Sequence, residues 1–548
     1  MFCLDDGERL LEGPAPDGPP TAVMPGTVLS GEAATRTFGN SATTNESLAT
    51  QRSRRTKTTL AAVAVFLIAV VGWAAYKYYR PVGSRQIESM AVMPFVNTGG
   101  NPDMEYLSDG ITESLINSLS QIPELAVKAR SSVFTYKGKD VSPQQVAKDL
   151  SVQAVLNGRV QQRGEQVIMN VELVDTATGN QLWGEQYTRK ATDIIQLQSE
   201  IARDVSGKLR AKLTGADQEK VAKTSTDDPE AYQLYLRGRF HWNKRKPDDI
   251  RKSIEYFQQA IDKDPTYALA NASLAEAYIL IPNYRLGRPE DSYPKARAAA
   301  LRAIEINPNL AEAYCSLASI TSNYEWKFPE AEVQFRKAIE FNPNYATAHQ
   351  WYAEYLLSMG RSDEAVAEMR RALELDPLSL IINGMVGVAL RLDGKSDEAL
   401  AQLEKTAELD PDFARTHLFL AETYQSLGRF DEAVDEFAKY FILIGEAPDD
   451  TRRFVEQVKK AAKNGGQRSY SRAMAEIIEA HAGPTPPPAT VMAGYWARAG
   501  ETDKAFDILE KAYSAHDDAL LSLKDEKLDP LKSDPRYKDL LRRVGLPE

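Results

Sequence analysis

Cysteine is nearly absent from this sequence: Cys3 and Cys315 are the only two among 548 residues. A disulfide framework or a cysteine-ligated metal centre therefore cannot be built. Five histidines are present, but none lies in H-E-x-x-H or another metal-ligand spacing. The signatures G-x-S-x-G, H-R-D and D-F-G are also absent, so we assign no catalytic residue, metal or cofactor, and we predict that the chain is not an enzyme.

An excess of positive charge is lacking as well. The net charge is −11, which argues against general nucleic-acid binding because such proteins neutralise phosphates with Lys and Arg. The charged fraction of 26% and the hydrophobic fraction of 43% are those of ordinary globular protein. At about 100 to 200 residues per domain, the length predicts several domains.

The N-terminal part divides into a polar tail and an apolar run. Residues 1–57 are rich in Pro, Gly, Ser and Thr without a hydrophobic period, which predicts a disordered tail. Residues 58–79 begin with an uncharged stretch that nearly spans a bilayer core of about 30 Å and end in aromatic residues, which predicts one transmembrane helix. A cleaved signal peptide and a buried core helix are the alternatives. The basic residues before the run outnumber those after it, so we expect the N-terminus in the cytoplasm and the C-terminal domains outside it.

Residues 86–214 alternate between strand and helix patterns. The runs "VQAVLNGRVQQ", "QVIMNVELVD" and "QLWGEQYTR" are joined by "RGEQ" and "TATGN", which contain the glycines expected of hairpin turns. Helical stripes are expected near residues 104–120, 143–150 and 193–212. We therefore predict a small α+β domain, followed by a polar linker over 215–228.

The rest of the chain has an internal period that is marked by proline. The segments "FRKAIEFNP", "MRRALELDP" and "LEKTAELDP" end at Pro343, Pro377 and Pro411, which are 34 residues apart. This period, with two helices per unit, is the tetratricopeptide signature and predicts an all-α superhelix over 229–445. We expect two irregular helices and a Pro-rich connector over 446–488, and a last repeat with a capping helix over 489–548.

Small residues recur at fixed places in these units. Ala365 and Ala372 precede Pro377 by 12 and 5 residues, with Met369 between them. Small side chains allow two helices to approach closely, so these positions are predicted at helix crossings.

One family resemblance covers nearly the whole α+β region. The stretches "MAVMPFVNTGGNPDMEYLSDGITESLINSLSQIPELAVKARSSVFTYKGKD" and "VLNGRVQQRGEQVIMNVELVDTATGNQLWGEQYTR" resemble the TolB amino-terminal/FlgO-like domain that precedes tetratricopeptide repeats in bacterial proteins. The resemblance implies a single-pass protein of the bacterial inner membrane and an interaction role. Relatives of this type often carry a serine/threonine kinase, an adenylate cyclase or a winged-helix domain, but no catalytic residue transfers to this chain.

The stretch "AVMPFVNTGGNPDMEYLSDGI" raises the question of a ligand site. Its glycines do not have the G-x-G-x-x-G spacing of a dinucleotide loop. Glu105, Asp109 and Glu113 are spaced to share one helix face, where three carboxylates can hold a hard cation. A solvated acidic face near a helix N-terminus is the simpler interpretation and the one we prefer.

Aligning the repeats predicts a binding surface on the inner face of the superhelix. A central row contains Glu276, Glu354 and Glu422, and a neighbouring row contains Gln350 and Leu418. We expect these residues to line a groove for a protein or peptide partner with basic and apolar residues, and not for nucleic acid. The first hypothesis is thus a membrane-anchored interaction scaffold. The alternative is the sensor half of a membrane kinase or adenylate cyclase whose catalytic domain is missing from this chain.

Overall fold

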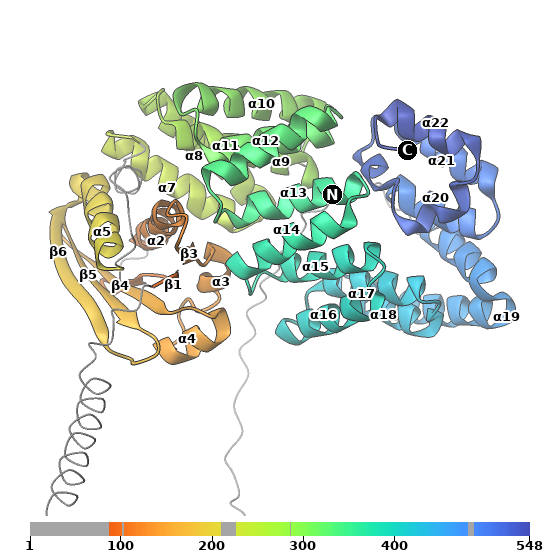
Figure 1. Ribbon diagram of the computed structural model, residues 1–548, viewed down its shortest axis with the longest axis horizontal. Helices are drawn as coiled ribbons and strands as arrows, with labels where there is room; N and C mark the ends of the chain where they lie inside the picture. The colour runs from red at the N-terminus through yellow and green to blue at the C-terminus, as the bar shows by residue number, and fades with distance from the viewer. Residues whose placement is uncertain (1–86, 101–103, 210–225, 285, 481–486) are drawn as a thin grey trace, which may run out of the picture. The chain divides into compact units, whose positions relative to one another are not determined.

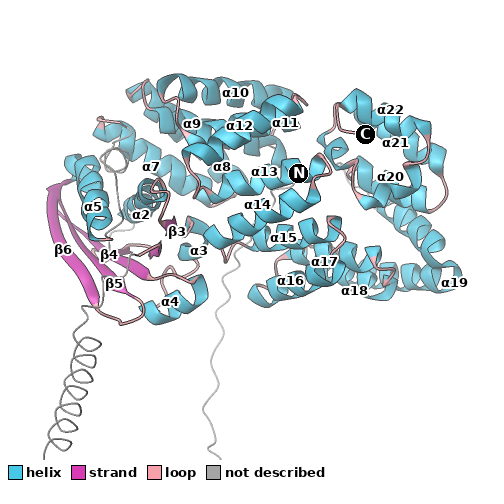
Figure 2. Cartoon of the chain, in the orientation of Figure 1, coloured by secondary structure: helices cyan, strands magenta, loops and turns pink. Residues whose placement is uncertain are grey.

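The computed structural model describes residues 87–548, except 101–103, 210–225, 285 and 481–486. The predicted tail over 1–57, the apolar run over 58–79 and most of the predicted linker over 215–228 lie outside the described residues. The described part consists of an α+β domain followed by helical hairpins (Figures 1 and 2).

The sheet of the first domain combines parallel and antiparallel pairing. Its strand order is β3-β1-β4-β5-β6, with β2 also paired to β4. The strands are β1 (Ser89–Val92), β2 (Val96–Asn97), β3 (Ala126–Val127), β4 (Ala154–Arg163), β5 (Gln166–Asp175) and β6 (Gln181–Lys190). β4, β5 and β6 form the antiparallel meander that the sequence predicts, and Gly164 and Gly179 adopt positive φ in its two turns.

Among the described residues of this domain, four α-helices accompany the sheet: α2 (Glu105–Ser120), α3 (Arg130–Phe134), α4 (Pro143–Leu150) and α5 (Ile194–Lys208). The apolar stripes predicted for α2 and α5 form much of the domain core, together with alternate residues of β5. Leu115 and Leu119 of α2 and Leu197 of α5 are fully buried. The predicted helix over 143–150 is confirmed.

The apolar run "MAVMPF" at residues 90–95 does not form one continuous strand. β1 ends at Val92, and β2 resumes at Val96. Pro94 has no N–H to donate to a ladder, and the N–H of Phe95 donates to Thr112 Oγ1 of α2 instead. The Phe95 ring packs over Gly158 of β4, where a Cβ atom would lie 2.5 Å from ring carbons. Between β1 and β2 the chain therefore packs against α2 and β4 and does not continue as a strand.

Hairpins of two helices follow the α+β domain. The first helix of each pair is α7 (Pro229–Asn243), α9 (Ala268–Asn283), α11 (Ala311–Asn323), α13 (Ala346–Ser358), α15 (Leu380–Leu392) and α17 (Ala414–Ser426). The second helix is α8 (Pro247–Lys263), α10 (Pro289–Ile306), α12 (Phe328–Phe341), α14 (Ser362–Leu375), α16 (Ser396–Leu409) and α18 (Phe430–Leu443). Gly360, Gly394 and Gly428 turn the chain within three hairpins with φ of 74°, 76° and 73°, a backbone conformation that glycine adopts without steric cost.

The small residues of the repeats lie where the period predicts. Ala331, Ala338, Ala365 and Ala372 have no exposed surface, and neither do Phe335 and Met369 between them.

Substituting Ala372 with Phe should destabilise the repeats, because the ring has no room at this helix crossing. We expect a cost of about 1 to 3 kcal/mol in the free energy of unfolding. Urea denaturation of the variant beside the wild type measures it. An unchanged midpoint would contradict the assigned register.

The C-terminal part combines an interrupted helix with a last hairpin. α19 (Pro448–Ala480) loses helical geometry at Gly465 and Gly466, so it consists of two helices, as expected for residues 446–488. The last hairpin is α20 (Ala489–Arg498) and α21 (Thr502–Ser514). The predicted capping helix is α22 (Pro535–Val544). Two 3-10 helices precede it, η3 (Asp518–Ser522) and η4 (Glu526–Leu531).

The prediction of a transmembrane architecture requires correction. In the part of the chain that the structure describes, no helix is both long and apolar enough to cross a bilayer. The 33 residues of α19 are interrupted at Gly465 and Gly466, and its first half carries charged side chains throughout. This finding stands against the fold class with one transmembrane helix and against a single-pass location in the bacterial inner membrane with a cytoplasmic N-terminus. The described architecture is an α+β domain joined to tetratricopeptide-like hairpins.

Candidate functional site: the inner helix row

The predicted binding rows fall at equivalent positions of the first helices. Glu276, Glu354 and Glu422 are each the ninth residue of their helix, in α9, α13 and α17. Gln350 and Leu418 are each the fifth residue, in α13 and α17. The first helices of successive hairpins pack side by side, so these residues follow one inner row. Their environments nevertheless differ.

Glu276 is enclosed by partners from its own chain. Its carboxylate lies 2.8 Å from Arg239 Nη1 of α7 and accepts a hydrogen bond from the Tyr345 hydroxyl at 3.2 Å. Only 6% of the residue is exposed. Arg239 also contacts Glu113 of α2, at 2.6 Å from Nη2, so one guanidinium joins the α+β domain to the repeats. The carboxylate of Glu276 therefore does not form a free acidic wall.

The acidic face of α2 is a buried contact surface. Asp109 and Glu113 are each 5% exposed, which corrects the preferred interpretation of a solvated face. Lys137 Nζ lies 2.7 Å from Asp109 and 2.6 Å from Glu105, whereas Glu113 is flanked by Arg130 and Arg239. Burial raises the pKa of Asp109; at Glu113 the two arginines outweigh burial and lower the pKa. Cations of the chain thus occupy the positions a metal would take, and no group of described His, Cys, Asp or Glu residues could hold one.

Glu354 differs from the other two acids of the row. It is half-buried and accepts a hydrogen bond from Gln350 Nε2 at 3.0 Å, but no described residue forms an ion pair with it. Burial raises its pKa. Glu312 of α11, on the same inner side, has a pKa raised to about 7 by burial. Neither carboxylate forms an ion pair with a described residue, although Arg415 acts to lower the pKa of Glu354 and Arg239 acts to lower that of Glu312.

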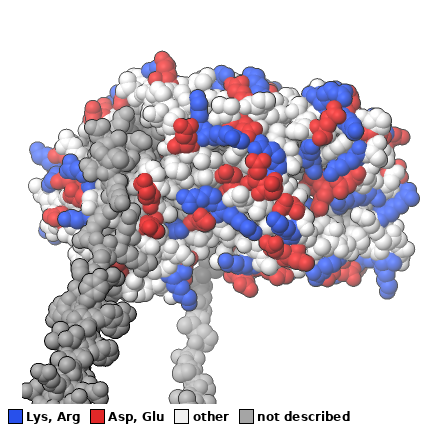
Figure 3. Space-filling view, viewed as in Figure 1, with Lys and Arg blue, Asp and Glu red and all other residues white. Residues whose placement is uncertain are grey.

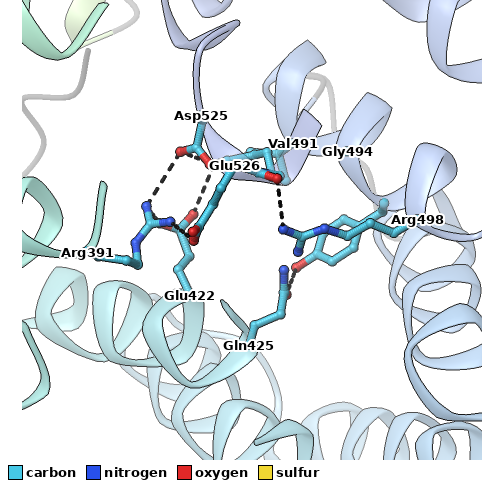
Figure 4. A pocket seen from close by; sticks show the side chains of 10 residues that line it. Arg391, Glu422, Gln425, Val491, Gly494, Arg498, Asp525 and Glu526 are labelled. Atoms are coloured by element: carbon cyan, nitrogen blue, oxygen red, sulfur yellow. Dashed lines mark hydrogen bonds and ion pairs between the residues drawn. The ribbon is translucent and has the colours of Figure 1, made fainter. Parts of the chain in front are cut away.

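Glu422 belongs to a network of buried charges at the far end of the row (Figure 4). The guanidinium of Arg391 in α15, with 3% of the side chain exposed, lies 2.6 Å from Glu526, 3.5 Å from Asp525 and 3.6 Å from Glu422. Lys527 Nζ lies 3.5 Å from Glu422 and 3.3 Å from Asp525. Burial opposes ionisation of Asp525, but the two cations outweigh it and lower its pKa to about 2.

The cavity beside this network is small. It has a volume of about 20 Å³ and is also lined by Gln425, Tyr495 and Arg498. That volume holds about one water molecule and no peptide or cofactor. The network therefore joins the C-terminal segment to α15 and α17. Sequence periodicity could not reveal this, because Asp525 and Lys527 lie outside the 34-residue pattern.

Side chains of the repeats also bind the α+β domain directly. Asn344, in the turn between α12 and α13, donates from Nδ2 to the carbonyls of Ser120, Ile122 and Leu125 at 3.1, 2.9 and 3.1 Å. The Ser120 carbonyl belongs to the last residue of α2, where the helix itself supplies no donor, and the other two belong to the turn that follows. The amide of Asn344 therefore caps a helix that is more than 200 residues distant in sequence.

The next turn, between α14 and α15, makes the second set of contacts. Ser131 and Ser132 of α3 donate from their hydroxyls to the carboxylate of Asp376. The N–H of Leu378 donates in return to Ser132 Oγ at 2.8 Å, and the N–H of Ala129 donates to the Leu375 carbonyl at 2.9 Å. We call the turns Asn342–Asn344 and Asp376–Leu378 the docking turns.

The surface charge is mixed. On the face shown in Figure 3, acidic and basic side chains alternate over the repeats. Several of these charges form exposed pairs within one helix, such as Arg371 with Glu374.

Two kinds of family match agree with this division. Residues 85–204 match the family described as "HilA/YgeH-like transcriptional regulator, second domain". Residues 335–367 and 390–441 match tetratricopeptide repeat families. The tetratricopeptide prediction is therefore confirmed, and the chain has the fold of a tetratricopeptide-type protein-interaction scaffold. The comparisons do not show the TolB amino-terminal/FlgO-like resemblance.

Individual proteins that resemble the chain cover parts of it. A protein of Rhizobium meliloti (strain 1021) named "Putative adenylate cyclase 3" is 34% identical over 234 residues, which is 42% of this chain and 39% of that relative. Among solved structures, YrrB, titled "a TPR protein with an unusual peptide-binding site", is 22% identical over 37% of this chain and 97% of its own, with a TM-score of 0.28. A thermophilic TPR protein of Thermus thermophilus is 18% identical over 36% of this chain and 99% of its own, with a TM-score of 0.30.

Proposed function

We propose that the chain binds a protein or peptide partner along the inner helix row, through a partner segment with basic and apolar residues. The observation that carries this proposal is the carboxylate of Glu354, which lies on that row without an ion pair among the described residues. A cation of the partner would offset the cost of its burial and would steer the encounter. Gln350 holds the carboxylate in place, and Leu418 offers a half-buried apolar contact further along the row.

Glu276 and Glu422 have a different part in this proposal. Each is already paired with cations of the chain. They therefore fix the shape of the row, and Glu354 supplies the charge that a partner would meet. The resemblance of the α+β domain to the TolB amino-terminal/FlgO-like family is consistent with an interaction role and remains part of the proposal.

A phage-displayed random peptide library panned on the full chain tests the proposal. We expect enrichment of peptides with Lys or Arg beside apolar residues. The Glu354→Gln variant should bind a selected peptide about fivefold more weakly, which corresponds to about 1 kcal/mol, and with a shallower salt dependence, because one charge contact is lost.

The matched control is Glu398→Gln. This glutamate lies on the second helix α16, has 58% of its side chain exposed and pairs only weakly with Arg370 at 3.3 Å. The control should bind like the wild type. If Glu354→Gln also binds with unchanged affinity and salt slope, the binding surface lies elsewhere, such as on the α+β domain.

A second candidate function is a regulatory role beside a separate catalytic domain, of the adenylate cyclase or serine/threonine kinase type. The observation that favours it is the 34% identity to a protein named putative adenylate cyclase over 39% of that protein's length. Adjacent coding sequence with a cyclase domain, or with H-R-D and D-F-G, would support it. Adjacent genes without either would favour the scaffold alone.

A further inference from the structure

Two histidines of the repeats each lie between two hydrogen-bond acceptors. Nδ1 of His417 is 2.6 Å from the carboxylate of Glu436, and its Nε2 is 2.8 Å from the Pro411 carbonyl. His349 repeats this arrangement 68 residues earlier, with Glu368 at 2.6 Å and the Pro343 carbonyl at 3.0 Å. Both side chains are almost fully buried, at 7% and 6% exposure.

At His417 both ring nitrogens face acceptors, so only the doubly protonated imidazole can donate to both. A carbonyl oxygen can only accept, so Nε2 must carry a hydrogen. A neutral imidazole would then present a lone pair at Nδ1 to a carboxylate oxygen 2.6 Å away. Binding a second proton turns this repulsive contact into a charge-assisted hydrogen bond.

The repeat between them makes the same contacts without a titratable group. Asn383 is the fourth residue of α15, as His349 and His417 are the fourth residues of α13 and α17. Its Nδ2 donates to the Pro377 carbonyl at 2.9 Å, and its Oδ1 accepts from Gln402 Nε2 at 2.9 Å. The amide pair therefore occupies the same structural position in a form that pH does not change.

We propose that the pair His417–Glu436 is a proton-dependent clasp, which holds the hairpin α17–α18 together and weakens as the pH rises. Leu418 directly follows this histidine. Opening of the clasp would therefore loosen a helix that carries the inner row, but the clasp does not depend on what that row binds.

The charges around His417 define the pH window. The hydrogen bond that His417 donates to Glu436 raises the pKa of His417, while burial and Lys439 of α18, 2.8 Å from Glu436, oppose this. The turn before α17 contributes the Pro411 carbonyl. Burial opposes ionisation of Glu436, but the hydrogen bonds from His417 and Lys439 outweigh it and lower its pKa.

The direction of the pH effect follows from these shifts. The contribution of His417 to stability is fully present below its unfolded pKa of about 6.5 and is lost as pH rises through its higher folded pKa. The contribution of Glu436 is present above about pH 4.3 and is lost as pH falls through its lowered pKa. The clasp is therefore strongest between about pH 4.3 and 6.5.

Exchanging the two kinds of pair tests the proposal in the full chain. In urea denaturation at pH 6 to 9, the unfolding equilibrium constant of the wild type should rise about tenfold for each unit by which folding raises the pKa of His417. The double variant His417→Asn with Glu436→Gln, which copies the amide pair, should show a flatter pH profile. The reverse exchange, Asn383→His with Gln402→Glu, should show a steeper one.

Histidine NMR of the full chain provides a second readout. The imidazole of His417 should titrate above about 6.5 in the folded wild type. Parallel pH profiles of the wild type and both double variants would overturn the proposal, as would titration of His417 at or below its unfolded value.

Discussion

Replacing Arg391 with Met should destabilise the C-terminal part of the chain by about 3 to 5 kcal/mol, because the loss of one partner leaves buried charges without compensation. Three carboxylates surround this guanidinium, those of Asp525, Glu526 and Glu422. In the variant, Lys527 would be the cation that remains beside them. Methionine keeps much of the side-chain volume, so the effect reports charge more than packing. Urea denaturation at neutral pH measures it.

Two comparisons separate this effect from a general loss of packing. Lowering the pH should reduce the deficit of Arg391→Met, since protonation removes the unpaired negative charges. Arg370→Met removes an exposed pair with Glu398 at 3.3 Å and should cost less than about 1 kcal/mol. A deficit of Arg391→Met that stays constant with pH would contradict the assigned role of the network.

Changing Asn344 to Asp should release the α+β domain from the repeats. The substitution preserves shape but replaces the donor to three carbonyls by a carboxylate that can only accept. We expect a loss of about 3 kcal/mol in the free energy of unfolding. Arg371 lies 2.9 Å from Asn344 Oδ1 and would pair with the new charge, so the loss should not exceed this value. Hydrogen exchange of residues 119–127 beside thermal unfolding measures the release.

The chain supplies a matched control for this change. Asn309 follows the same Asn-Pro-Asn order one repeat earlier, but it is exposed. Asn309→Asp should alter the unfolding free energy by less than about 0.5 kcal/mol. Equal melting temperatures for the two variants would show that the docking turns contribute little.

The repeats and the antiparallel meander were predictable because their signals are local. The 34-residue spacing of Pro343, Pro377 and Pro411 gives the register of the hairpins, and the glycines between strand patterns give two turns. The same register puts Glu276, Glu354 and Glu422 at the same position of their helices.

The chemistry of those positions was not predictable from the pattern. Glu276 is neutralised by Arg239 of another hairpin, and Glu422 by Lys527 more than 100 residues later. The helical pattern places Glu113 on the solvated face of its helix, but Arg130 and Arg239 from other elements form ion pairs with it. Each of these pairings depends on tertiary contact, for which a single sequence carries no periodic signal. The sequence pattern therefore predicts where a charged residue lies on its helix, but not whether another charged residue pairs with it.

The docking turns also impose an order on synthesis. The carbonyls of residues 120–125 leave the ribosome about 220 residues before the amide of Asn344 that binds them. At about 5 to 20 residues per second, this delay lasts roughly 10 to 40 s. During that time water must satisfy the carbonyls that Asn344 later binds, and only earlier hairpins, such as α7 against α2, can contact the α+β domain. Completion of the contact between the two parts is consequently a late event of biogenesis, and mutations in the docking turns should lower the yield of native protein even where the α+β domain forms normally.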